Sequence, residues 1–296
     1  METGFLANLL LVVDSGSMAE AARRIGVTPA AVAQQVQALE RELGVPLLVR
    51  AGRTVIPTEA GHRVVEKARA LVRDAAELKA VALTDEPSGE LRIGTITTAL
   101  LSLLPDALAG FAKAFPQAQV LIRAGTSMEL YETLQRGDID VAICLHPPFA
   151  LPKAYDWHLL REEPIVVLAP KALADVDPHT LLQREPFIRY DRSLGGGKQA
   201  DQYLRAAKIV PHELFELNSL MAIAMMVDRG LGVSLAPDIV SPLTVGLNIA
   251  RLPLPAPAEH RRFGLLWHRA SARARLIKGL MECAEQVVMR DIKHAG

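Results

Sequence analysis

The sequence predicts a multidomain α/β protein with an N-terminal winged helix-turn-helix, a long linker helix, and a two-lobed, doubly wound α/β region. Short amphipathic helical patterns separated by a glycine break predict the first part, and a basic hairpin pattern follows them. Alternating strand and helix patterns from about Leu91 predict the two lobes. We expect the parts to be residues 1–58, 59–88 and 89–296, with lobe I at about 89–163 and 264–296 and lobe II at about 164–263.

The first two helices have recognisable limits. Apolar residues recur at helical spacing over residues 2–13, and Gly16 follows as a stop. Ser17 can cap the second helix, because a hydroxyl accepts from the free amides of the first turn, and Glu20 completes a capping-box pattern. Gly26 suits the left-handed conformation that ends a helix, so a short break is expected there.

The third helix, predicted over residues 29–43, starts at Thr28-Pro29, where proline at the first helical position loses no hydrogen bond. Its apolar residues form one stripe that should face the core. They are Val32, Val36, Leu39 and Leu43.

The opposite face of this helix is expected to be exposed and carries Ala30, Gln34, Gln37 and Arg41, with Ala33 and Ala38 at its borders. Small residues let a helix approach base edges closely, and glutamine can pair with adenine through two hydrogen bonds. Base readout is therefore predicted for Ala30, Ala33, Gln34 and Gln37. An ordinary solvated helix face is the alternative interpretation.

A β-wing is predicted next, from Leu47–Arg50, a turn at 51–53, and Thr54–Pro57. Arg50, Arg53 and Thr54 could bind phosphates beside the groove, which fixes register without reading sequence. The wing weakens the alternative interpretation of the third helix, because it places a second DNA-binding feature directly after it.

A long helix follows Thr58, with an apolar seam about three heptads long. The seam consists of Val64, Ala68, Leu71, Ala75, Leu78 and Ala82. A lone helix cannot bury such a seam, so we expect a dimer whose two readers meet half-sites about one helical turn apart.

This segment resembles the LysR-type transcriptional regulators. The residues that carry the resemblance are Phe5, Gly16-Ser17, Ala21-Ala22, Thr28-Pro29-Ala30, Leu39-Glu40, Leu43-Gly44, Arg50 and Pro57–Gly61. Ala33 and Leu48 depart from the family, which usually has serine and phenylalanine there. The resemblance implies a dimer of dimers and a two-lobed domain, similar to periplasmic binding proteins, that closes on a small co-inducer. The candidate DNA-binding residues are Ser17, Thr28, Pro29, Ala30, Ala33, Gln34, Gln37, Arg50, Arg53 and Thr54.

After the breaker cluster Glu86–Gly89, strands and helices alternate. In the first lobe we expect strands at 91–96, 119–123 and 139–145 and helices at 99–114 and 127–136. In the second we expect strands near 165–168, 186–190, 213–217 and 232–235, before a strand at 264–268 returns to the first. Two crossovers would make a hinge, and a ligand that binds one state better would rotate the lobes.

Hydroxyl residues and helix N-termini follow the first two strands of this region, at the strand ends where ligands gather. Thr97, Thr98 and Thr126 therefore predict a site for a carboxylate or another small anion, because free amides and the helix dipole supply partial positive charge. Helix capping is the alternative. The candidate effector-binding residues are Thr97, Thr98, Thr126, His146, Arg192, Lys198 and Asn218.

The glycine-rich run Ser193–Lys198 does not predict a nucleotide site. Arg192 and Gln199 stand where a phosphate-binding loop needs glycine and serine or threonine. A flexible loop whose amides, Arg192 or Lys198 reach an anion is the milder interpretation, and a mobile surface loop is its alternative.

Composition and motifs exclude several other classes. Lys+Arg and Asp+Glu are both 33, so no net positive field announces nucleic acid. The two cysteines, Cys144 and Cys283, are too few for a disulfide framework or a zinc cluster. Cys144 should be a buried hydrophobe, with redox sensing as the alternative. Asp138 and Asp140 lack an evident partner, and no catalytic motif is present, so we expect no enzyme activity, cofactor or metal.

The apolar run Phe5–Val13 lacks a basic leader, and no run reaches the roughly 18 apolar residues of a membrane span, so a cytoplasmic protein is expected. The sequence predicts a DNA-binding transcriptional regulator that binds double-stranded DNA, self-associates as a dimer or tetramer, and responds to a small anionic effector between its lobes. The alternative is a two-lobed solute-binding or transport-related protein, which would have no use for residues 17–58.

Overall fold

The computed structural model describes residues 2–52, 54–83, 89–238, 242–255, 258 and 260–295. The chain forms two compact units that divide at residues 89 and 90, except that the short segment Gln135–Asp138 groups with the first unit. Each unit has its own hydrophobic core.

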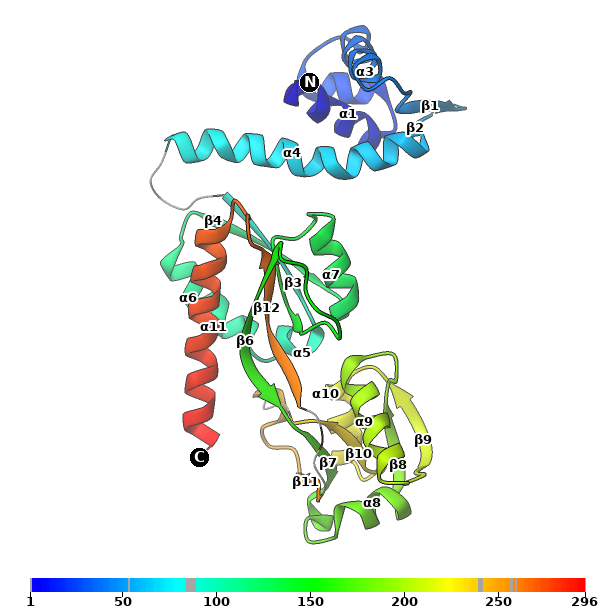
Figure 1. The fold of residues 1–296 in the computed structure, drawn as a ribbon, viewed down its shortest axis with the longest axis vertical. Helices are drawn as coiled ribbons and strands as arrows, with labels where there is room; N and C mark the ends of the chain where they lie inside the picture. The colour runs from blue at the N-terminus through cyan, green and yellow to red at the C-terminus, as the bar shows by residue number, and fades with distance from the viewer. Residues whose placement is uncertain are drawn as a thin grey trace. The chain divides into compact units, whose positions relative to one another are not determined.

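The first unit contains four helices and a two-stranded hairpin among its described residues (Figure 1). Its elements are α1 (Thr3–Ser15), α2 (Met18–Ile25), α3 (Pro29–Leu43), β1 (Leu48–Ala51), β2 (Thr54–Pro57) and α4 (Glu59–Leu83). Strands β1 and β2 are antiparallel, with Leu48 opposite Pro57 and Ala51 opposite Thr54. The predicted winged helix-turn-helix and long helix are confirmed.

Local capping sets the limits of these helices. The Ser17 hydroxyl accepts from the Glu20 amide at 3.3 Å, and the Thr28 hydroxyl accepts from the Ala31 amide at 3.2 Å. Gly26 is left-handed, with φ of 71°, as its position predicts. The capping box predicted at Ser17 forms only one of its two bonds, because the Glu20 carboxylate pairs with Arg23 and Arg24 one turn along the helix.

The buried stripe of α3 is shorter than predicted. Val32, Val36 and Leu39 are buried, whereas Leu43 is 38% exposed. Leu43 lies in the last turn of α3, directly before the left-handed Gly44 that redirects the chain. The stripe therefore anchors the middle of α3 and leaves its C-terminal end uncovered.

The seam of α4 is buried only at its start. Ala68 is buried in the core that α1 and α3 also form, and Val64 is partly buried against it, but Leu71 and Leu78 are 46% and 73% exposed. The side chain of Ala82 lies outside the described part of the chain. Apolar surface on the second half of α4 is thus left uncovered within one chain.

Lobe I of the second unit is built on a five-stranded sheet of order β4-β3-β5-β12-β6. Its elements are β3 (Gly89–Thr95), α5 (Thr97–Leu100), α6 (Leu104–Ala114), β4 (Ala118–Ala124), α7 (Ser127–Gln135), β5 (Val141–Leu145), β6 (Tyr155–Glu163), β12 (Arg261–His268) and α11 (Ala274–Ala295). Strands β3 and β5 are parallel, whereas β12 is antiparallel to both β5 and β6. The helix predicted at 99–114 is interrupted, because Pro105 starts a new helix in its first turn.

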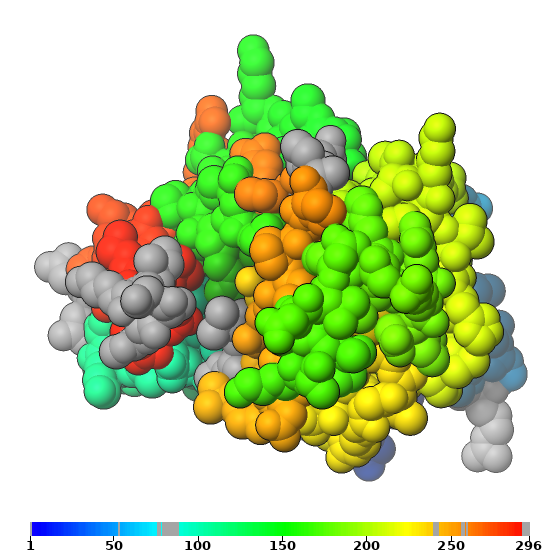
Figure 2. Space-filling model, turned by 90° about the horizontal axis from the view of Figure 1, so that it is seen from below, coloured from blue at the N-terminus to red at the C-terminus, as the bar shows by residue number. Residues whose placement is uncertain are grey.

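Lobe II contains two smaller sheets, β10-β7-β11 and β8-β9, joined by a bridge between Phe187 and Val233. Its elements are β7 (Ile165–Pro170), the 3-10 turn Lys171–Leu173, α8 (Pro178–Arg184), β8 (Pro186–Tyr190), α9 (Gly195–Ala206), β9 (His212–Leu217), α10 (Leu220–Asp228), β10 (Ser234–Pro237), the 3-10 turn Pro242–Thr244 and β11 (Ile249–Pro253). Figure 2 views this lobe from the side of α8, with its green and yellow residues toward the reader. The four predicted strands are confirmed, while β6 and β11 were not predicted.

Two crossovers connect the lobes: one passes from β6 to β7, and the other reaches β12 after β11. Glu163 and Arg261 lie opposite each other in the β6–β12 register, and each side chain is 2% exposed. The Arg261 Nε lies 2.8 Å from one Glu163 carboxylate oxygen, and the Arg161 Nε lies 2.9 Å from the other. A buried ion pair therefore joins the two crossover strands.

Candidate functional site

The predicted reading face of α3 is open to solvent in the first unit. Ala30, Gln34, Gln37 and Arg41 are exposed, as are Thr28 and Pro29 at the start of the helix, while Ala33 is half-buried. On the border of this face, the Asn8 amide donates to the Gln35 side-chain oxygen at 2.6 Å. The face with Gln34 and Gln37 is thus available to a partner, and helical periodicity predicted that these residues are exposed.

The wing is held to α3 by direct hydrogen bonds. The Glu40 carboxylate accepts from the amides of Leu47 and Leu48 at 2.7 and 3.2 Å. Arg50 and Thr54 are exposed at the hairpin, whereas Arg53, also predicted to bind phosphate, lies outside the described residues. The position of the hairpin relative to the reading face is therefore fixed by the protein itself.

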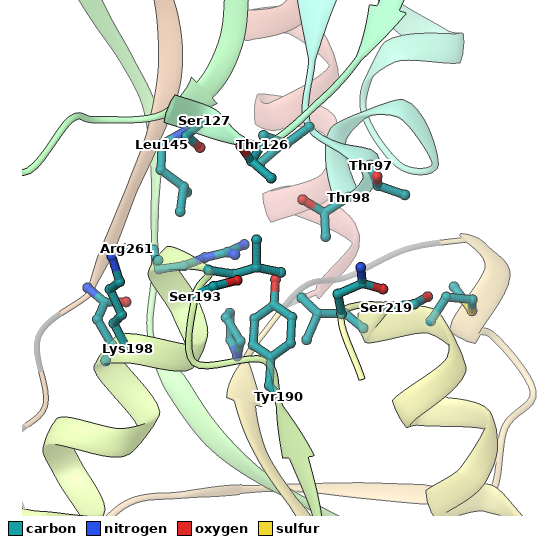
Figure 3. A pocket seen from close by; sticks show the side chains of 18 of the residues that line it. Thr97, Thr98, Thr126, Ser127, Leu145, Tyr190, Ser193, Lys198, Ser219 and Arg261 are labelled. Atoms are coloured by element: carbon teal, nitrogen blue, oxygen red, sulfur yellow. The ribbon is translucent and has the colours of Figure 1, made fainter. Parts of the chain in front are cut away.

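A cavity of about 1060 Å³ lies between the two lobes of the second unit (Figure 3). From lobe I it is lined by Thr97, Thr98, Thr126, Ser127, Glu129, Leu145 and His146. From lobe II and the crossovers it is lined by Tyr190, Ser193, Leu194, Lys198, Asn218, Ser219, Arg251, His260, Arg261 and Arg262. Six of the seven predicted effector-site residues line this cavity, and Arg192 does not.

Arg192 lies outside the cavity, because carboxylates of its own lobe hold its side chain. Its guanidinium lies 2.7 Å from both Glu213 and Glu216, and 3.6 Å from Asp201. The hydrogen bond to Glu213 is the main cause that raises the pKa of Arg192. The guanidinium is therefore neutralised outside the cavity.

The lobe I wall carries hydroxyls, but the amide of Thr126 already has a partner. The Thr126 amide donates to the Glu129 carboxylate at 2.8 Å, and the Glu129 amide donates to the Thr126 hydroxyl at 3.3 Å. The hydrogen bond from the Thr126 amide is the main cause that lowers the pKa of the Glu129 carboxyl, and a bond from the Thr126 side chain lowers it further. The amide of Thr126 is thus not available to a ligand anion, contrary to the sequence-based expectation, because the side chain of Glu129 occupies the N-terminus of α7.

The lobe II wall begins with the glycine run at the start of α9. A Cβ atom on Gly196 would lie 2.8 Å from the Tyr190 ring, and one on Gly197 would overlap the carbonyl of Asp191. A Cβ on Gly195 would lie 2.9 Å from Leu145 of lobe I. The glycines therefore let the first turn of α9 pack closely against both lobes, which is a steric role.

Tyr190 and Arg261 line the cavity next to the start of α9. The Tyr190 side chain is 5% exposed and points into the cavity in Figure 3. Burial raises the pKa of the Tyr190 hydroxyl, and Arg261, which shares a hydrogen bond with it, opposes this shift. The sequence-based prediction missed Tyr190, Arg261 and Arg262, although the basic run His260–Arg262 before the return strand was a usable signal.

The remaining candidate chemistry in the chain is structural. Asp140 pairs with Arg92 at 2.7 Å, and Asp138 pairs with Arg136 at 3.2 Å. Cys144 is fully buried, which raises the pKa of its thiol to about 12. Within the described ranges, no group of three or more His, Cys, Asp or Glu side chains could hold a metal ion. No helix in this part of the chain is long and apolar enough to cross a membrane.

Comparison with known proteins matches both units. Residues 5–62 match the bacterial regulatory helix-turn-helix model of the lysR family, and residues 84–288 match the LysR substrate binding domain. The HTH-type transcriptional regulator IlvR of Caulobacter vibrioides is 31% identical over 91% of this chain and 93% of its own length.

Solved structures agree with this match. A full-length OxyR variant of Pseudomonas aeruginosa aligns with a TM-score of 0.68 and 25% identity, over 96% of this chain and 94% of its own. Full-length CbnR in complex with its target DNA aligns with a TM-score of 0.63 and 22% identity, over 97% of this chain and all of its own, and supports the fold. The chain belongs to the LysR family and is a DNA-binding transcriptional regulator with an effector-binding domain.

Proposed function

We propose that α3 reads base edges through Gln34 and Gln37, with Ala30 and Ala33 allowing close approach, and that Ser17, Thr28, Pro29, Arg50, Arg53 and Thr54 contact the DNA backbone. The observation that carries this proposal is the solvent-exposed face of α3, opposite the buried stripe of Val32, Val36 and Leu39. Glutamine supplies base-specific hydrogen bonds, and the wing arginines supply phosphate contacts.

The test separates base readout from phosphate binding on a fragment that the full-length protein selects from random DNA. We expect Gln34→Ala to weaken binding to this fragment by about 5- to 100-fold and to leave binding to random DNA nearly unchanged. We expect Arg50→Ala to weaken both and to lower the salt slope by about one. Arg205→Ala removes an exposed cation of lobe II and is the matched control. Equal losses on both DNAs for Gln34→Ala would contradict the assignment.

The effector is proposed to be a small organic anion that binds between the lobes. The cavity is lined by hydroxyls, a buried tyrosine, cationic side chains and apolar side chains such as Leu145 and Leu194, which suits a carboxylate with an apolar body. Binding that favours one lobe arrangement would change DNA affinity, typically by 5- to 150-fold for about 1–3 kcal/mol of coupling. A gel shift of the full-length protein with a panel of small carboxylates tests this, and no change across the panel would contradict it.

Self-association is proposed through the second half of α4, because Leu71 and Leu78 are exposed there. A seam of this kind is buried by a second copy of the helix, so a dimer is expected, and the family likeness supports assembly to a tetramer. In sedimentation equilibrium, the Leu78→Glu variant should contain a larger fraction of monomer than the wild-type protein. An unchanged mass distribution would count against this interface.

The domain limits proposed are 1–58 for DNA binding, 59–88 for the linker helix and 89–296 for effector binding. We propose a cytoplasmic, non-enzymatic regulator, since its proposed partner is chromosomal DNA of a bacterial cell. Turnover of a small molecule by the purified protein would contradict the non-enzymatic role.

A further inference from the structure

We infer that the anionic group of the effector binds at Lys198 and Arg262, on the lobe II and crossover side of the cavity. The far end of the effector then carries a hydroxyl or ammonium donor, so the effector is a monocarboxylate with a polar tail. This inference rests on the proposed effector site and reverses the orientation that the threonines suggested from the sequence.

Among the described residues that line the cavity, the lysine and arginine side chains come from lobe II and from the first two residues of β12, where the second crossover ends. Lys198 lies on α9, Arg251 on β11, and Arg261 and Arg262 on β12. Two of these charges are neutralised by carboxylates that do not line the cavity: Arg251 lies 3.2 Å from Asp238, and Arg261 pairs with Glu163.

Lys198 and Arg262 are left with no ion pair to a carboxylate in the part of the chain that the structure describes. Glu162 stands opposite Arg262 in the strand register, but its carboxylate lies 3.7 Å from His260 and does not line the cavity. These two cations are therefore the charges that a bound anion would neutralise.

The two free cations belong to segments that pack on each other. A Cβ on Gly196 would lie 3.4 Å from the Arg261 side chain, and the Gln199 amide donates to the His260 carbonyl at 3.5 Å. Lys198 and Arg262 are adjacent in sequence to Gln199 and Arg261, which make these contacts. In Figure 3, Lys198 and Arg261 lie across the cavity from Thr97 and Thr98. Two cations on adjoining segments are an effective receptor for one carboxylate.

The opposite wall repels a second anion. Glu129 is the one carboxylate among the described residues that line the cavity, and its lowered pKa keeps it ionised. Thr97 and Thr98 line the cavity, and their hydroxyls can accept from or donate to a ligand hydroxyl. Like charges close together cost free energy, so a donor group suits this end better than a carboxylate.

The location of the anion is tested first, with selenate as a probe whose anomalous scattering marks its position in crystals of the full-length protein. We expect a peak beside Lys198 and Arg262 in crystals soaked in selenate at roughly 20 mM, a concentration suited to weak binding of a single anion. The Lys198→Gln/Arg262→Gln variant should lose it, and the matched Thr97→Val/Thr98→Val variant should retain it. A peak on the threonine wall, a peak that survives loss of both cations, or no cavity peak in the wild type would overturn the inference.

The polarity of the effector is tested with two probes of equal chain length, 5-hydroxypentanoate and glutarate, at equal ionic strength. We expect 5-hydroxypentanoate to raise the melting temperature of the full-length protein more than glutarate, and Glu129→Gln to reduce this difference. Equal or stronger stabilisation by glutarate, or none by either probe, would overturn the assigned class. If anions bind at Lys198 and Arg262 but no anion changes DNA affinity, the proposed function fails and this site assignment stands.

Discussion

The candidate DNA surface and the effector cavity are built in different ways. The candidate DNA surface comes from one contiguous stretch, residues 17–54, in which the reading face of α3 is set by the buried stripe on its opposite side. The cavity is assembled from segments that range from Ile96 to Arg262, and its shape depends on the crossovers between the lobes. A substitution distant from the ligand can therefore disturb the cavity, whereas the DNA surface should respond mainly to changes within its own unit.

The two regions also use charge differently. The centre of the α3 face carries neutral amides, and an ion pair elsewhere in the first unit, Arg63 with Glu59 on α4, is exposed. The crossovers beside the cavity hold the buried pair of Arg261 and Glu163. Exposed pairs contribute little to stability, while loss of one partner of a buried pair leaves an uncompensated charge. Electrostatic substitutions should thus affect the second unit far more than the first.

The largest effect is expected for Glu163→Gln. The amide leaves Arg261 and Arg161 facing each other at the crossover without a carboxylate, so the free energy of unfolding should fall by about 3–5 kcal/mol. Both tryptophans, Trp157 and Trp267, lie in the second unit, so their fluorescence during urea unfolding reports on this unit alone.

The matched control is Glu59→Gln in the first unit, which removes the exposed pair with Arg63. We expect a change of at most about 0.5 kcal/mol, measured by circular dichroism. Similar losses in the free energy of unfolding for Glu163→Gln and Glu59→Gln would show that the buried ion pair is no more important for stability than the exposed one.

A smaller effect is expected from adding a methyl group in each unit. On Gly61 it would overlap the Leu47 carbonyl beside the wing, and on Gly197 it would overlap the Asp191 carbonyl beside the cavity. Each alanine variant should lose about 1–3 kcal/mol of stability in its own unit. DNA affinity should fall for Gly61→Ala, and tryptophan fluorescence during unfolding should change only for Gly197→Ala.

Gly4→Ala in α1 is the control for these variants, because a Cβ there meets nothing within 4 Å. It should leave stability unchanged or raise it by roughly 0.5–1 kcal/mol, since alanine favours the helix. A lower unfolding midpoint by tryptophan fluorescence in Gly61→Ala would mean that the two units unfold together instead of independently.

The same contrast explains what could be predicted from the sequence. The limits of α3 were predicted because Thr28, Pro29 and Gly44 act on their immediate neighbours. Leu43 was wrongly assigned to the core, because burial at a helix end depends on where the chain goes next. The reading-face residues followed directly from helical periodicity.

The cavity was harder to predict, because its residues meet only through tertiary structure. The alignment of β9 beside β8 brings Glu213 and Glu216 to Arg192, and the sequence separates these residues by more than twenty positions. Strand β6 was missed because charged residues interrupt its apolar pattern at Arg161–Glu163. Two of those charges, Arg161 and Glu163, form the network with Arg261 at the crossover, so charges that hid the strand also join the lobes.

The smallest functional effect is expected at the two thiols of the second unit. Burial raises the pKa of Cys144 to about 12, so at pH 8 this thiol stays protonated and shielded. Cys283 is half-buried, and burial also raises its pKa, so it should react slowly with a disulfide reagent. We expect one thiol per native chain to be titrated, two after unfolding, and none in native Cys283→Ser. Since neither cysteine lines the cavity, modification of Cys283 should leave anion binding unchanged, and rapid native reaction of Cys144 would instead require that the core of lobe I opens readily.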